Sequence, residues 1–260
     1  MQNLMNKVLT TLTLALLFSA ATASAAKHSN VELLNMAGKQ RMLSQRIAKN
    51  YFYIGKNINA SKAVKQLKAS VTAFNKTQLT LGNSIKDDEI QNMIMFVDMS
   101  NEEFAEIAND KFSLDNGALV LDLSESMLEG SQYIVTALKK ESKKRTSAIV
   151  DLAGKQRMLS QRIAKYYISY QAGIKDKNSV IQMNDAVTSF NSAHKKLMSN
   201  KTNSAAINAE LKKVDKLWKI VYKFYMNIEK GGLPVIVYKT TDDIMKKMNN
   251  VTQMYVKLNK

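Results

Sequence analysis

The sequence predicts an all-α protein built as two tandem four-helix bundles related by internal duplication. Its 260 residues include one proline and nine glycines, and helix-favouring Ala, Leu, Lys, Met and Gln are abundant. The segment AGKQRMLSQRIAK occurs twice without change, at 37–49 and 153–165. The same offset of 116 residues aligns VTAFN at 71–75 with VTSFN at 187–191 without a gap. A duplicated unit of this length has room for four helices.

Segments rich in Gly, Asn, Asp and Ser divide each unit into four stretches of helical length. In the first unit Ser29 and Glu32 have the spacing of a capping box, which predicts a helix start. The expected helices are 30–55, 60–82, 87–113 and 117–142, followed by 146–172, 178–199, 204–230 and 234–258.

The first 25 residues resemble a secretory signal peptide. Basic MQNLMNK precedes the apolar run VLTTLTLALLFSA, and Ala23-Ser24-Ala25 has the small-residue pattern of a cleavage site. An uncleaved anchor is the alternative, but the run is shorter than the roughly 20 apolar residues that a spanning helix needs. We therefore expect a signal peptide at 1–25, four-helix units at 26–142 and 143–260, and a periplasmic location.

The join between the units allows two arrangements. The stretch KKESKKRTSAIVD before the second copy has no proline, glycine or capping box, which favours one helix continuing from the fourth segment into the fifth. Such a helix would stack the bundles end to end. A turn near 142–146 would instead place them side by side. We expect the continuous helix.

Composition excludes several classes of protein. There is no cysteine, so disulfides and thiolate metal sites are absent, and the two histidines, His28 and His194, stand far apart without the spacing of metal ligands. The net charge of +16 would suit nucleic acid, but export argues against such a partner. No GxSxG, phosphate loop or HExxH motif occurs. We expect neither an enzyme nor a cofactor.

The repeated segment has two faces when it is placed on a helix. An apolar side is expected to pack inside its own bundle and consists of Leu33, Met36, Ala37, Leu43, Ile47 and Tyr51. The opposite side should point away from that bundle and carries Gly38, Arg41, Met42, Gln45, Arg46 and Lys49. Packing inside each bundle would preserve only the first side, so the identity of the second indicates a functional surface. Accident or a recent duplication is the alternative.

Glycine and arginine on this second side suggest anion binding. Gly38 and Gly154 each cost a helix roughly 1 kcal/mol relative to alanine, so a close approach by a helix or ligand should compensate. Arginine forks donate paired hydrogen bonds to planar oxyanions. If two such helices face each other across a twofold or pseudo-twofold axis, Arg46 and Arg162 would converge and would repel unless an anion lay between them.

The repeated segment resembles the signature of the PilJ family, the type IV pili methyl-accepting chemotaxis transducer N-terminal domain. It is also similar to the P-box of NarX-type nitrate/nitrite sensor domains. The resemblance implies a four-helix sensor unit with nitrate held between two first helices by the motif's last arginine and by backbone near its glycine. By motif position these are Arg46 with Gly38, and Arg162 with Gly154. The earlier arginine is implicated less directly. The candidate ligand-binding residues are Gly38, Arg41, Gln45, Arg46, Gly154, Arg157, Gln161 and Arg162.

The sequence departs from those receptors because it shows no later membrane-spanning segment and no output domain. We therefore expect an exported, non-enzymatic sensor-like protein that binds nitrate or nitrite and acts through a homodimer or a membrane-bound signalling partner. The alternative is a structural or interaction module of the envelope that uses the same helix faces without a small ligand. Attraction of its basic charge to anionic lipid or glycan is a weaker third reading.

Overall fold

The computed structural model describes residues 28–142 and 145–258, and within these ranges the chain is helical without strands. The expected signal peptide lies outside the described residues. The first four helices are α1 (Asn30–Gly55), α2 (Ala60–Ser84), α3 (Asp88–Asn109) and α4 (Leu114–Ser142). The second four are α5 (Arg145–Ala172), α6 (Lys177–Met198), α7 (Ala205–Tyr225) and α8 (Pro234–Lys257), with a short 3₁₀ helix at Ile228–Lys230. The prediction of an all-α fold is confirmed.

Local sequence signals set several of the helix starts. Ser29 and Glu32 form the predicted capping box at α1. Asp87, Asp176 and Ser204 each accept a hydrogen bond from the backbone N–H three residues later, which satisfies a free donor at the start of α3, α6 and α7. Pro234 begins α8, where its missing N–H costs nothing. The expected and observed boundaries differ most at the end of α7, observed at 225 instead of 230, and at the end of α3, observed at 109 instead of 113.

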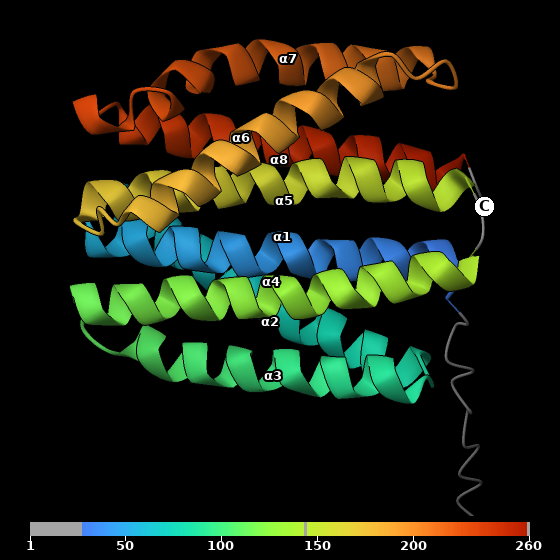
Figure 1. Ribbon diagram of the computed structural model, residues 1–260, viewed down its shortest axis with the longest axis horizontal. Helices are drawn as coiled ribbons and strands as arrows, with labels where there is room; N and C mark the ends of the chain where they lie inside the picture. Colours follow the sequence, from blue (N-terminus) through green and yellow to red (C-terminus); the bar gives the residue numbers. More distant parts are fainter. Residues whose placement is uncertain (1–27, 143–144, 259–260) are drawn as a thin grey trace, which may run out of the picture.

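The two groups of four helices lie side by side. In Figure 1, α1 in blue and α5 in yellow run next to each other through the centre, with α2, α3 and α4 on one side and α6, α7 and α8 on the other. The α1–α5 contact is the most extensive between any two helices of the described chain, and α4 and α8 add further contacts to this pair. Helices α1, α4, α5 and α8 follow the long axis of the molecule, whereas α6 crosses it obliquely (Figure 1).

The expectation that the two units stack end to end was wrong, because α5 packs beside α1. Residues 143–144, across which a continuous helix was expected, lie outside the described residues. Side-by-side packing buries a second face of each central helix, including Met42 and Met158 at 4% exposure each. An end-to-end stack would leave this face in water, so the hydrophobic effect favours the observed arrangement.

Each central helix is consequently buried on both sides. The face predicted to pack within its own unit is buried at Leu33, Ala37, Leu43, Ile47 and Tyr51. The face expected to point outward is also buried, because it packs against the other unit. The repeated segment therefore lies at the internal pseudo-twofold axis of a single chain.

Candidate functional site

Two arginines meet at the contact between α1 and α5, and they are Arg41 and Arg157. Each is only 1% exposed. A Cβ atom added to Gly38 would lie 3.2 Å from Nη2 of Arg41 and 3.4 Å from Nη2 of Arg157. A Cβ atom on Gly154 would lie 3.2 Å from Nη2 of Arg157 and 3.6 Å from that of Arg41. The two guanidinium groups thus share the space over both glycines, and this is the close approach that the glycines permit.

The partners of the two arginines follow the internal duplication. Arg41 Nη1 donates to Gln132 Oε1 at 2.6 Å, and Arg157 Nη1 donates to Asn249 Oδ1 at 2.9 Å. Gln132 belongs to α4 and Asn249 to α8, so each fourth helix supplies one amide to the arginine of its own unit. The shape of the site is therefore nearly symmetric.

The charge of the site is not symmetric. Arg41 Nη2 donates to the Asp151 carboxylate at 2.8 Å, whereas Arg157 Nη2 donates to the Asn35 side-chain oxygen at 2.9 Å. Asp151 and Asn35 stand 116 residues apart and are equivalent positions of the two units. Of the two buried arginines, one therefore contacts a carboxylate and the other contacts an amide. The carboxylate, Asp151, also binds Lys139 at 2.8 Å.

Burial and neighbouring charges both shift the pKa values of these groups. Burial, followed by the charge of Arg41, lowers the pKa of Arg157 below its usual value. Burial alone would raise the pKa of Asp151, but the charges of Arg41 and Lys139 hold it below its ordinary range, so the carboxylate is ionised at neutral pH. The Nε atoms of Arg41 and Arg157 are buried and make no hydrogen bond within residues 28–142 and 145–258. Each arginine consequently keeps an unused donor.

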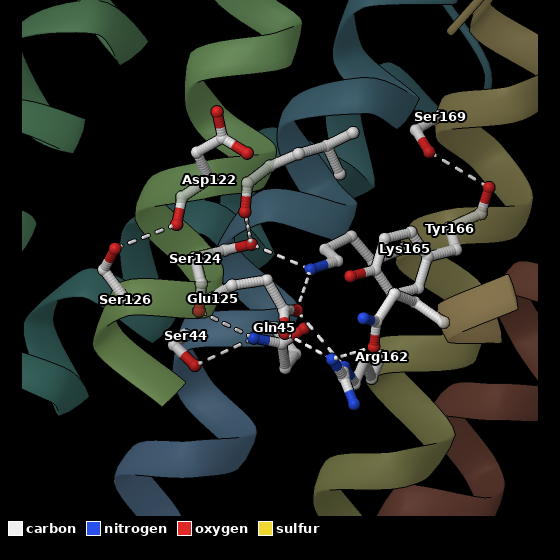
Figure 2. A network of polar contacts seen from close by, with 12 residues as sticks. Ser44, Gln45, Asp122, Ser124, Glu125, Ser126, Arg162, Lys165, Tyr166 and Ser169 are labelled. Carbon is white, nitrogen blue, oxygen red and sulfur yellow. Dashed lines mark hydrogen bonds and ion pairs between the residues drawn. The ribbon is translucent and has the colours of Figure 1, made fainter. Parts of the chain in front are cut away.

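The later arginines of the motif do not meet, contrary to the sequence-based expectation. Figure 2 shows Arg162 and Lys165 of α5 facing Glu125 of α4, which forms an ion pair with both. Arg162 also donates to Gln182 of α6 at 2.9 Å. Arg162 is therefore bound to a carboxylate of the first unit.

The equivalent cluster in the other half uses α1 and α8. Lys49 Nζ lies 2.6 Å from the Asp242 carboxylate, and Gln66 donates to the second carboxylate oxygen at 2.5 Å. Burial alone would raise the pKa of Asp242, but the charge of Lys49 and, less strongly, that of Arg46 lower it. Arg46 therefore lies near this cluster. Arg46 and Arg162 thus belong to two separate clusters on different helices.

These clusters join the two units. Lys49 and Lys165 are both fully buried, and each pairs with an acidic residue on the fourth helix of the other unit. Burial lowers the pKa of each lysine to about 8, opposed by Asp242 and by Glu125 respectively. Because a buried charge without its partner is costly, these pairs fix the relative position of the units.

The two glutamines expected at the ligand site, Gln45 and Gln161, make hydrogen bonds within their own units. Gln45 donates to the backbone oxygen of Ser124 at 2.8 Å, and Gln161 donates to that of Thr241 at 3.3 Å. These bonds tie α1 to α4 and α5 to α8. Of the predicted residues, only Gly38, Arg41, Gly154 and Arg157 come together in one place.

The sequence-based expectation placed Arg46 and Arg162 together and did not include Asp151 or Asn35, whereas Arg41 and Arg157 are the arginines that meet in the structure. Gly38 and Arg41 are three residues apart and share a helix face, whereas Arg46 lies five residues after Arg41 and about 140° away from it around the helix. That spacing was the available signal for Arg41. The signal for the other two residues was a duplicated position that is acidic in one copy and an amide in the other.

The chain matches a known protein family. The model of the PilJ family, described as type IV pili methyl-accepting chemotaxis transducer N-term, matches residues 22–92 and 140–230. The chain belongs to the PilJ family. No curated protein and no solved structure matches the chain.

The two matched segments of this PilJ protein contain the two copies of the repeated motif. PilJ domains are sensory transducer modules, not enzymes, and their N-terminal domains are typically periplasmic. No helix in the described part of the chain is long and apolar enough to cross a membrane.

Proposed function

We propose that this PilJ protein is a sensory module that binds one small planar oxyanion, nitrate or nitrite first, between Arg41 and Arg157. The observation that carries the proposal is that two buried guanidinium groups lie together over two glycines, although just one of them contacts a carboxylate. An anion between the two groups would relieve their repulsion and accept hydrogen bonds from their unused Nε donors.

The chemistry of the site favours a monoanion. Two arginines and one aspartate leave one positive charge uncompensated, since Lys139 also binds Asp151 but is 38% exposed and therefore hydrated. Nitrate is planar and weakly hydrated, so it suits the planar guanidinium fork better than sulfate or phosphate, whose dehydration costs more.

The site also gives the anion a means of changing the protein. It lies between α1 and α5, the two helices that join the units, and each arginine is bonded to the fourth helix of its unit. An anion that draws the two guanidinium groups together would shift these helices relative to each other. A signalling partner that contacts both units would detect such a shift.

The alternative of an interaction surface is disfavoured by burial. Arg41, Gln45 and Lys49 and their counterparts in the second copy are at most 1% exposed. They are covered by the other half of the same chain, so they are not available to a separate protein.

Isothermal titration calorimetry with nitrate, nitrite, chloride and sulfate tests the proposal. Charged hydrogen bonds contribute about 1.5–3 kcal/mol each, so Arg41→Gln and Arg157→Gln should each weaken nitrate binding tenfold or more. Arg162→Gln is the matched control because it removes an arginine of the same motif that is bound to Glu125 instead. Full nitrate binding by the Arg157→Gln protein, or no binding by the wild type, would overturn the proposal.

A further inference from the structure

A second site lies where the beginning of α1 meets α2 and the end of α8. A cavity of about 460 Å³ opens there, within the size range of small-molecule sites. It is bounded by residues of both units, since α8 belongs to the second. Its charged lining consists of Lys39, Lys76, Lys257 and Glu32.

The cavity has an excess of positive charge. None of its three lysines forms an ion pair with another residue in the described part of the chain. Glu32 already accepts hydrogen bonds from the backbone N–H and the hydroxyl of Ser29 in the α1 capping box. The lining thus carries a net charge of two positive units. Burial, then the charges of Arg157 and Lys76, lower the pKa of Lys39.

Comparison with the other half of the molecule indicates what neutralises such charge. There, the Asp151 carboxylate binds both Arg41 and Lys139. The residue equivalent to Asp151 is Asn35, which lines the cavity and accepts a hydrogen bond from Arg157. At Asp151 the protein itself supplies a carboxylate that binds the nearby cations, whereas at Asn35 the nearby lysines line an open cavity.

We propose that this cavity binds a small organic dianion, such as a dicarboxylate, whose charged ends are held by the three lysines. Two positive units match two carboxylates. Met36, Ala73 and Val256 also line the cavity and can cover the carbon chain between those ends. Thr77 and Thr80 also line the cavity, but their hydroxyl groups donate to the backbone oxygens of Ala73 and Lys76, so the lysines supply the donors for the carboxylates.

This site is distinct from the arginine pair but adjacent to it. Asn35 lines the cavity, and its side-chain oxygen accepts a hydrogen bond from Arg157. A dianion in the cavity would therefore act on the position of Arg157. The inference does not depend on nitrate binding, because the cavity and its charge exist whether or not an anion lies between Arg41 and Arg157.

Titration calorimetry with succinate and glutarate at low ionic strength tests the inference. We expect both to bind the wild type more tightly than sulfate, which cannot cover the apolar lining. Lys76→Ala should weaken binding tenfold or more, and Lys39→Ala should do the same. Lys68→Ala is the control, because Lys68 is an exposed lysine two turns earlier on the same helix and does not line the cavity.

Two results with the lysine variants and the wild type would overturn the inference, and a third involves Arg157→Gln. One is the absence of binding by either dicarboxylate. The other is equal binding by the Lys76→Ala and Lys68→Ala proteins, which would show attraction to general surface charge. Arg157→Gln separates the two sites, since it should weaken nitrate binding tenfold or more and leave succinate binding within about threefold of the wild type. Loss of succinate binding in Arg157→Gln together with full binding by Lys76→Ala would place the dicarboxylate at the arginine pair and would also contradict the inference.

Discussion

Replacing Asp151 by asparagine should strengthen anion binding at the arginine pair. The change keeps the size of the side chain and removes the one carboxylate that Arg41 contacts. It also makes the two halves alike, because the equivalent residue is Asn35.

The size of the effect follows from Coulomb's law. An anion on the far side of the Arg41 guanidinium would lie about 6 Å from the Asp151 carboxylate, and at an effective dielectric constant of about 20 the repulsion is about 3 kcal/mol. Solvent and the nearby Lys139 reduce it, since Asp151 is 14% exposed. Each 1.4 kcal/mol is tenfold in affinity, so nitrate should bind about 10- to 100-fold more tightly to the variant.

The same change should destabilise the protein without ligand. Arg41 and Lys139 lose their carboxylate, which should lower the free energy of unfolding by about 1–3 kcal/mol. Calorimetry measures the affinity, and thermal unfolding with and without nitrate measures the stability. Asp185→Asn, an isosteric change at an exposed carboxylate on α6, is the control and should alter neither.

The reverse change provides a second test of the same reasoning. Asn35→Asp adds a carboxylate next to Arg157, so it should weaken nitrate binding, and the double variant should return close to the wild type. Unchanged or weaker nitrate binding by a folded Asp151→Asn protein would refute the role given to the missing charge.

Three further predictions concern the glycine, the outer arginine and the buried ion pairs. Gly38→Leu should abolish nitrate binding with helix content unchanged by circular dichroism, because its side chain would occupy the space of the Arg41 guanidinium; retained binding would contradict this. Arg162→Gln should lower the free energy of unfolding in urea by about 1–3 kcal/mol and leave nitrate affinity unchanged. A tenfold loss of nitrate affinity would instead indicate that Arg162 contacts the anion. Glu125→Gln should lower the free energy of unfolding by about 3 kcal/mol, because it leaves the buried Lys165 ammonium with the Ser124 hydroxyl but without a carboxylate. Since the charges of Lys165 and Arg162 outweigh burial and lower the pKa of Glu125 to about 2, its contribution is present above pH 4.5 and is lost as the pH falls toward 2. The variant should thus lose less stability than the wild type over that range, and parallel urea curves would contradict the assignment.

Much of the fold could be predicted from the sequence because its local signals agree. Few helix breakers, an exact repeat and a capping box at Ser29 give the helices and the duplication directly. These signals depend on residues close together in the chain. The relative placement of the units does not, because it depends on contacts between α1 and α5, whose paired residues lie more than 100 positions apart.

The burial of the charged face could not be predicted for the same reason. A face with Arg41, Lys49 and Gln45 reads as solvent-exposed when the helix is considered alone. It is buried because Asp242 lies opposite Lys49, and Asp151 lies opposite Arg41. These acidic residues come from distant segments, and no local pattern pairs them with the motif. The identity of the two copies is thus explained in part by packing between the units, and the arginine pair is the part that packing leaves with uncompensated charge.

The most direct test of the central claim is a crystal structure of the wild-type protein grown with nitrate, compared with one grown without it. The account predicts planar density between the guanidinium groups of Arg41 and Arg157, over Gly38 and Gly154, in the first crystal alone. Nitrate bound only elsewhere, with the two arginines in the same positions in both crystals, would contradict the account.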